Sequence, residues 1–268
     1  MASEAALPRT QARMASEAAH YDAVAQHYGE ADFYKRGPYR DWQLAVIRAA
    51  LRLEPGARLA DVGGGDGAFG LDCVRGVEGW ALEVVEPSAA MRGAAGSAPD
   101  GVTFAAQDAV AWARDAGAPR CSRLLLKEVV HHVDPAARAA FFADARANRL
   151  AAGGRALVVT RPRVDIDYPF WDAARDVWAA HQPSEADLAD ELRAAGFSAV
   201  DVSVEAYAME MPLERWLDLV AARFWSTFAH FDDAALAAGI ADVRARATPD
   251  AAGAIRFEER LVLIDAQV

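Results

Sequence analysis

Four glycines between positions 63 and 67 follow a short apolar run and stand two residues after a carboxylate, Asp61. Glycine loses more conformational freedom on folding than any other residue, so this density predicts a turn through unusual dihedral angles or a ligand against the backbone. The apolar run at 57–62 is typical of a strand, and a helical pattern continues to about Arg75. Strand, bare loop and helix in this order predict a ligand site where backbone N–H groups at the helix start are open.

A second acidic residue, Glu86, ends the next apolar run at 80–86. A carboxylate at this point accepts hydrogen bonds from both hydroxyls of a ribose. Asp61 would repel a diphosphate but suits an ammonium group, so the two acids favour a nucleoside that carries an amino acid. Ala68 in the third glycine position of a G-x-G-x-x-G/A pattern keeps an NAD-dependent oxidoreductase open as an alternative. A non-catalytic nucleoside-binding module is the alternative from another class.

Strands and helices alternate along the rest of the chain, which predicts a parallel sheet covered on both faces. Strands are expected at 57–62, 80–86, 102–107, within 122–130, and at 155–160, 199–207 and 255–266. The helix that Asp134 and Pro135 open is expected to reach Leu150 and to end before Gly153 and Gly154. Later helical patterns cover 184–197, 212–231 and 233–245.

These motifs, in this order, resemble the class I S-adenosylmethionine-dependent methyltransferases. "LADVGGGDGAFG" is similar to the first motif of that family and "VVEPSAAM" to the second. "AAQDAVAW" resembles the adenine-contacting segment, "LLLKEVVHHVD" the fourth-strand motif and "LAAGGRALVV" the fifth-strand motif. "YDAVAQHY" resembles the helix before the core, so the resemblance covers about residues 21–162.

The resemblance implies an α/β fold, with a Rossmann-like, seven-stranded, mostly parallel sheet, helices on both faces and helical lid additions. It implies S-adenosyl-L-methionine as cofactor and S-adenosyl-L-homocysteine as product. Asp61 and the glycines would hold the amino-acid part of the cofactor, and Glu86 the ribose. The implied cofactor-binding residues are Tyr28, Asp61, Gly63, Gly64, Gly65, Glu86, Pro87, Met91, Asp108, Ala109, Lys127 and Glu128.

Several of these residues also have purely structural interpretations. The glycines alone would make a tight turn, and Glu86 alone would be an ordinary exposed acid. Asp108 is also a good helix N-cap, a role that is compatible with binding adenine. Met91 is also suited to core packing.

Two adjacent histidines, His131 and His132, follow the fourth strand near the implied position of the methyl group. Histidine is the usual base for an oxygen or nitrogen acceptor that must lose a proton. These two are therefore the candidate catalytic residues, although a histidine pair also fits the fourth-strand motif without acting as a base. A thioether acceptor needs no base, because its sulfur is already a neutral nucleophile.

Aromatic residues and arginines outside the core are the candidates for acceptor binding. Aromatic rings form apolar pockets or attract a cationic product, and an arginine can bind a carboxylate through two parallel hydrogen bonds. Alternatively, the rings simply pack the lid, and the arginines form ion pairs within the protein. The candidate substrate-binding residues are Tyr34, Tyr39, Arg161, Trp171, Trp178, Arg223 and Trp225.

The preferred acceptor is a small molecule, a thioether or hydroxy carboxylate, methylated on sulfur. The layout resembles the S-methyltransferases that act on methylthio-hydroxy acids toward dimethylsulfoniopropionate. The alternative is O- or N-methylation of an aromatic or other small metabolite with a histidine base.

Net charge and cysteine content limit the partners, metals and cellular compartments that are expected. A formal charge of −11 disfavours nucleic acid and anionic membranes as partners. The two cysteines form no ligand cluster, so no metal site is predicted, and they suggest a reducing compartment. The expected location is cytoplasmic, and the expected state is a monomer or a homodimer.

The chain divides into four expected regions. Because "MASEAA" occurs at 1–6 and again at 14–19, residues 1–20 are interpreted as a flexible or added leader, with an alternative start at Met14. Residues 21–52 are expected to form an N-terminal helical lid and 53–162 the S-adenosylmethionine-binding core. Residues 163–268 are expected to complete the sheet, with substrate-binding helices inserted at 163–182 and 209–248.

Overall fold

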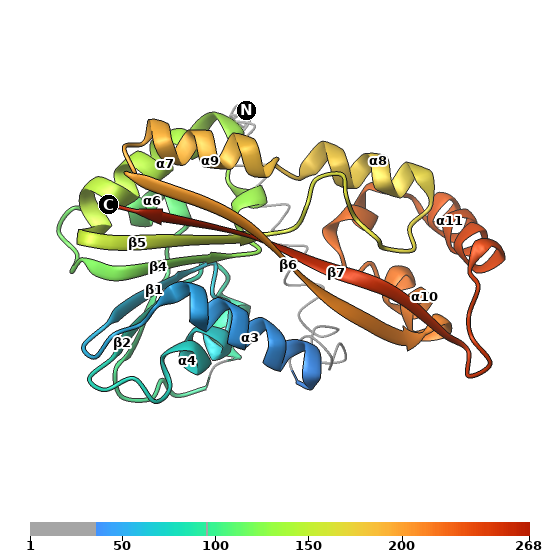
Figure 1. The fold of residues 1–268 in the computed structure, drawn as a ribbon, viewed down its shortest axis with the longest axis horizontal. Coiled ribbons are helices and arrows are strands. Elements are labelled where there is room, and N and C mark those ends of the chain that lie inside the picture. Colours follow the sequence, from blue (N-terminus) through green and yellow to red (C-terminus); the bar gives the residue numbers. More distant parts are fainter. Residues whose placement is uncertain (1–35, 95) are drawn as a thin grey trace, which may run out of the picture.

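A seven-stranded sheet lies at the centre of the computed structural model, which describes residues 36–94 and 96–268 (Figure 1). The strand order is β3-β2-β1-β4-β5-β7-β6. Strands β1 to β5 pair in parallel, and β7 is antiparallel to both β5 and β6. This confirms the predicted α/β, Rossmann-like fold class. The strands are β1 (Arg58–Val62), β2 (Ala81–Val85), β3 (Val102–Ala105), β4 (Cys121–Lys127), β5 (Leu150–Thr160), β6 (Ala199–Pro212) and β7 (Ala254–Gln267).

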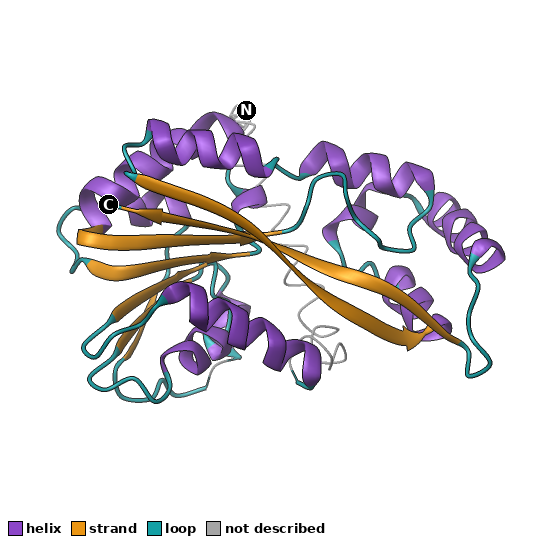
Figure 2. Cartoon of the chain, viewed as in Figure 1, coloured by secondary structure: helices purple, strands orange, loops and turns teal. Residues whose placement is uncertain are grey.

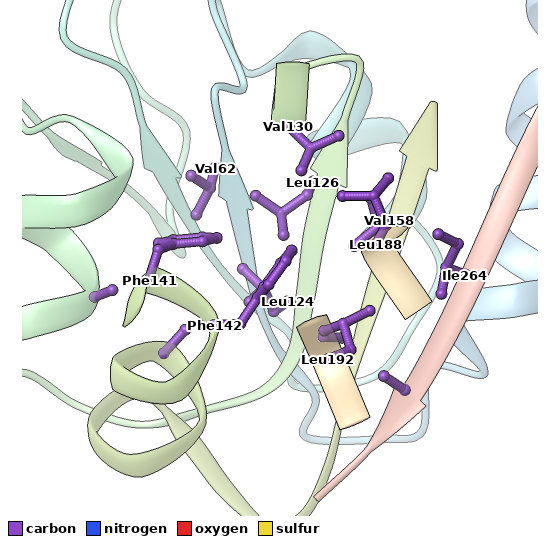
Figure 3. Close-up of a cluster of buried hydrophobic side chains, with 14 of the residues drawn as sticks. Val62, Leu124, Leu126, Val130, Phe141, Phe142, Val158, Leu188, Leu192 and Ile264 are labelled. Carbon is purple, nitrogen blue, oxygen red and sulfur yellow. The ribbon is translucent and has the colours of Figure 1, made fainter. Parts of the chain in front are cut away.

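Helices cover both faces of the sheet (Figure 2). Helices α6 (Ala109–Arg114), α7 (Pro135–Asp144) and α9 (Glu185–Ala194) pack on one face, where Phe141 and Phe142 lie against strand residues such as Leu124 and Leu126 (Figure 3). Helices α3 (Pro38–Leu51) and α4 (Ala68–Val74) pack on the other face through residues that include Ile47 and Cys73. Burial on both faces explains why the central strands are apolar at successive positions.

The strand order reverses between β1 and β4, because β2 and β3 lie on one side of this pair and β5 on the other. In open α/β sheets, ligands bind at such a reversal, beyond the carboxyl ends of the strands. Two short helices follow strands at this edge: α5 (Ala89–Gly93) after β2 and the 3-10 turn η1 (Val130–His132) after β4.

A two-stranded ribbon extends beyond the sheet. β6 pairs with β7 along all of its 14 residues, whereas β5 pairs with β7 only at residues 155–160. Helices α8 (Asp172–His181), α10 (Leu213–Ala221) and α11 (Asp233–Arg246) gather around the outer part of the ribbon (Figure 1). We call these three helices and the outer ribbon the lid. Its core is largely aromatic: Tyr168, Phe170, Trp171, Trp178, Trp216, Phe228 and Phe257.

Two of the expected helices end earlier than the sequence pattern predicts. Helix α7 ends at Asp144, a π-helical turn (Ala145–Arg149) follows, and β5 already starts at Leu150. The turn buries Arg149, whose guanidinium lies 2.7 Å from Glu83 Oε2 and 4.4 Å from the ring centroid of Trp112. Leu150 then pairs with Cys121, so Gly153 and Gly154 fall inside a strand and not at a helix end.

The second expected helix, at 212–231, is interrupted. Helix α10 ends at Ala221, Arg223 has a left-handed backbone (φ 53°), and a 3-10 helix (Ser226–His230) follows. Residues 209–212 belong to β6 and not to an inserted helix. In the part of the chain described here, no helix is both long and apolar enough to cross a membrane.

Candidate active site

Charged side chains follow four neighbouring strands at the carboxyl edge of the sheet. Asp61 lies near the end of β1, Glu86 follows β2, Glu128 follows β4 and Arg161 follows β5. Carboxyl ends of parallel strands meet at one edge, so the fold brings these sequence-predicted residues to one side of the molecule.

The loop after β1 needs glycine both for its backbone conformation and because side chains would not fit there. Gly63, Gly65 and Gly67 all have positive φ values, of 74°, 59° and 75°. A Cβ atom on Gly63 would lie 2.5 Å from Val129 Cγ2, and one on Gly64 would lie 2.8 Å from the Asp61 carboxyl carbon. The loop is therefore pressed against the end of β1 and the segment after β4, and side chains at these positions would push them apart.

Glu86 connects the glycine loop to the segment after β2. Its side chain is buried, and it accepts hydrogen bonds from the backbone N–H of Gly65 (3.2 Å) and of Ser88 (2.8 Å). Arg92 donates to the carbonyl of Glu86. Met91 lies over the loop, because a Cβ on Gly65 would be 3.0 Å from its Cε, whereas Pro87 is exposed.

Asp61 is a buried carboxylate, 2% exposed, and no side-chain cation among the described residues forms an ion pair with it. Burial raises its pKa to about 7, against the opposing effect of the Lys127 charge. An ammonium group placed beside Asp61 would supply the missing countercharge. The residue therefore fits the amino end of an amino-acid-bearing cofactor.

Lys127 and Arg40 lie near one aromatic ring. The Lys127 ammonium is 4.9 Å, and the Arg40 guanidinium 4.6 Å, from the centroid of Phe69. Arg40 also pairs with Asp72 at 2.7 Å. Burial lowers the pKa of Lys127, and the charge of Glu128 opposes this shift.

A buried polar network surrounds Arg161. Its Nε donates to Glu128 Oε1 at 2.6 Å, and its Nη1 donates to the Tyr168 hydroxyl at 2.6 Å and to Glu259. The Tyr168 hydroxyl donates to Glu259 at 2.7 Å, and Arg161 Nη2 donates to the Tyr39 hydroxyl at 3.0 Å. Burial raises the pKa of Tyr168 to about 12 and that of Tyr39 further, so both remain protonated donors. We call these five residues the Arg161 network.

The sequence reasoning missed two members of this network, Tyr168 and Glu259. A signal was available for Glu259, because it takes an inward position in the alternating pattern of Phe257, Leu261 and Leu263 along β7. Tyr168 lies in an irregular segment and gave no periodic signal.

The remaining candidate residues have diverse surroundings. Asp108 caps α6 through a 2.8 Å bond from the N–H of Ala111, and Ala109 is the first helical residue. The rings of His131 and His132 are partly buried and 4.0 Å apart.

In the lid, Trp171 and Trp178 are buried and Trp225 is partly buried. Arg223 donates to Asp233 and to the carbonyl of Phe231, both at 2.9 Å. Tyr28 and Tyr34 lie outside the described residues.

Comparisons with known proteins agree with this fold. A family profile described as "Methyltransferase domain" matches residues 34–202. Two crystal structures are similar over most of their length, at low sequence identity. For the [4+2]-cyclase SpnF, identity is 14%, coverage 93% of this chain and 94% of the other, and the TM-score 0.59. YcgJ of Bacillus subtilis is 15% identical, with 84% of this chain and 97% of the other covered and a TM-score of 0.58.

A third structure is that of Haemonchus contortus phosphoethanolamine N-methyltransferase 2, in complex with S-adenosyl-L-methionine. It is 14% identical, with 85% of this chain and 52% of the other covered and a TM-score of 0.50. No curated protein sequence matches the chain. Likeness at these identities shows the fold alone.

The fold and the family match define a class I methyltransferase-type protein. The chain belongs to the methyltransferase-domain family that its residues 34–202 match, and it is an S-adenosylmethionine-dependent methyltransferase.

Proposed function

We propose that this methyltransferase acts on a small-molecule acceptor that enters at the carboxyl edge, beside the ends of β4 and β5. The observation that carries the proposal is the position of the Arg161 network, which joins these two strand ends to helix α3 and strand β7 under the lid. Buried side chains at these strand ends suit a small ligand better than a macromolecule.

The cofactor roles are part of the same proposal. S-adenosylmethionine supplies an electrophilic methyl group when it is bound. Asp61 would neutralise its ammonium group, and Glu86, fixed by Gly65 and Ser88, would accept from the ribose hydroxyls. Tyr28, Gly63, Gly64, Gly65, Pro87, Met91, Asp108, Ala109, Lys127 and Glu128 remain proposed contacts on the strength of the family resemblance.

Thioether S-methylation remains the first candidate reaction, because it needs no base. The carboxylate end of the expected acceptor has lost support, since Arg161 and Arg223 both have partners within the protein. O- or N-methylation is the second candidate. It is favoured by the partly buried ring pair of His131 and His132, directly after β4, where a base would be needed.

The test is methyl transfer from tritiated S-adenosylmethionine to a panel of small thioethers, amines, phenols and hydroxy acids, with a protein and an oligonucleotide as controls. We expect label in at least one small molecule and none in the macromolecules. Label in the protein or the oligonucleotide alone would contradict the proposal.

A further inference from the structure

Glu128 has an unusual conformation at the point where β4 ends. It is one of three non-glycine residues with positive φ in the described chain, at 57°, and its N–H donates to the carbonyl of Val159 at 2.8 Å. A left-handed backbone at a non-glycine residue costs about 1 kcal/mol or more, so the surrounding structure must hold it in place. The hydrogen bond between Glu128 and Arg161 supplies such a constraint.

Only one oxygen of the Glu128 carboxylate is used in that contact. Oε1 accepts from Arg161 Nε at 2.6 Å, while Oε2 accepts no hydrogen bond from the described residues. The Glu128 side chain is 28% exposed, in contrast to 4% for Arg161 and 1% for Glu259. Glu128 is therefore the member of the acid–arginine group with an oxygen left for a ligand.

The charges around Arg161 do not cancel. Glu259, which also accepts from the Tyr39 and Tyr168 hydroxyls, already balances the guanidinium. Within the network two carboxylates thus face one guanidinium, and the adjacent cation, Lys127, feels the Glu128 charge but forms no ion pair with Glu128 among the described residues. The other ionisable groups at this edge are Asp61, Glu86, Lys127, His131, His132 and Arg40, of which Arg40 is paired with Asp72.

Aromatic rings adjoin the Arg161 network through Tyr39. The Tyr39 ring is 5.8 Å from that of Trp42 and 5.3 Å from that of Tyr207, and Trp42 and Tyr207 are both partly exposed. The Tyr39 hydroxyl bonds to Arg161, so this aromatic group adjoins the Glu128 contact. Aromatic faces and a carboxylate in one network each favour a cation.

We infer that the site is built for an acceptor that becomes positively charged on methylation, a thioether or an amine, and that Glu128 selects for it. This inference rests on the proposed function. A lone pair on the acceptor sulfur or nitrogen forms the new bond to the methyl carbon, and the old carbon–sulfur bonding pair returns to the donor sulfur. One positive charge thus passes to the acceptor.

Glu128 stabilises that charge as it develops, because the carboxylate is already fixed in place before the reaction. A thioether loses no proton. A neutral amine loses its proton to solvent after transfer. Phenolate or carboxylate acceptors would bring a negative charge next to Glu128, and the site disfavours them.

The test uses stable product-like cations on the full chain saturated with S-adenosylhomocysteine. Calorimetric titration with trimethylsulfonium and with tetramethylammonium is compared with titration with acetate and benzoate. We expect at least one cation to bind and both anions to fail. The tighter of the two cations then distinguishes a sulfur from a nitrogen acceptor.

The variant Glu128→Gln keeps the side-chain shape and an oxygen for Arg161 but removes the charge. At saturating S-adenosylhomocysteine, whose affinity for the variant is measured first, it should weaken cation binding about tenfold. The control Glu78→Gln removes the same charge from an exposed turn before β2, at the opposite edge of the sheet, and should change neither affinity.

Three outcomes would overturn the inference: neither cation binds the wild-type chain, the anions bind better, or Glu128→Gln leaves cation binding intact. The first two are measured on the wild type alone, so the inference stays testable if the variant does not fold. Failure of S-adenosylhomocysteine itself to bind would instead refute the function on which the inference rests.

Discussion

The carboxylate of Glu86 accepts a hydrogen bond from the backbone N–H of Gly65 at 3.2 Å, so the two cofactor motifs are in contact in the free protein. The contact joins the loop after β1 to the end of β2. A second bond, from the N–H of Ser88, fixes the other oxygen of the same carboxylate. The proposed ribose-binding group is therefore already oriented before a ligand arrives, which lowers the entropic cost of binding.

Replacing Glu86 by Gln should weaken S-adenosylhomocysteine binding by about 10- to 100-fold, as expected for losing a hydrogen bond to a charged group. The amide can still accept from Gly65 or Ser88, so the fold should be kept. Calorimetry on the variant, with Glu78→Gln as the matched control, measures the effect. Equal affinity in the wild type and Glu86→Gln would show that Glu86 is not a ligand.

Cofactor binding should depend on pH through Asp61. Burial raises the pKa of Asp61 to about 7 in the free protein, and only the ionised form can hold an ammonium group. Below pH 7 a proton must leave before the ligand binds, so affinity should fall by up to about tenfold per pH unit, whereas above pH 7 it should level off.

Titration with S-adenosylhomocysteine from pH 5.5 to 8.5 (chosen to bracket the pKa by about 1.5 units) would reveal this profile. Asp61→Asn should bind weakly at every pH and lose the slope. A variant that kept both the affinity and the slope would assign the pH dependence to another group.

Arg161 is expected to be essential for stability, since it is 4% exposed and pairs with two carboxylates. Arg161→Met should lower the free energy of unfolding by about 3–5 kcal/mol, because Glu259 is then left buried without its cation. Adding Glu259→Gln should recover part of the loss. Urea unfolding measures both variants, and a loss below about 1 kcal/mol would mean that the network is not coupled as the contacts indicate.

Alanine substitutions at two glycines, Gly63 and Gly56, distinguish the conformational cost of a positive φ from the steric cost of an added Cβ. Gly63→Ala introduces a Cβ 2.5 Å from Val129 Cγ2 at a φ of 74°, whereas Gly56 has a φ of 76° with no atom within 4 Å of the same Cβ position. Gly56→Ala should therefore lose only about 1–2 kcal/mol. Gly63→Ala should lose a further 1–3 kcal/mol or so through overpacking. Equal losses in thermal unfolding would show that the loop can move away from Val129.

The core sheet could be predicted from the sequence because its strands are local apolar runs bounded by glycines or capping residues. The strands that contain Leu59, Val84 and Leu125 can be found in this way. The antiparallel ribbon was underestimated: β6 was expected to end at 207 but runs to Pro212. The missed residues 208–212 hold only two buried side chains, Met209 and Met211, before Pro212, and so short an alternation does not extend a strand in the sequence pattern.

The errors elsewhere came from contacts that no local pattern encodes. The early start of β5 depends on the burial of Arg149 against Trp112 and Glu83, which lie on two other elements. The break at Arg223 depends on a left-handed turn that places its guanidinium beside Asp233.

For the site, strand ends predict Asp61, Glu86 and Glu128 as neighbours, whereas Arg161 is predicted only as an acceptor-binding arginine. The pairing of Arg161 with Glu128 and Glu259 became visible only in the structure, because the three residues are far apart in the sequence.

The most direct test of the account is calorimetric titration of the full chain with S-adenosylhomocysteine, with NADH titrated in parallel. We expect saturable binding of S-adenosylhomocysteine at one site per chain and no binding of NADH. Binding of NADH, or no binding of S-adenosylhomocysteine, would contradict the assignment of the carboxyl-edge site to an amino-acid-bearing nucleoside.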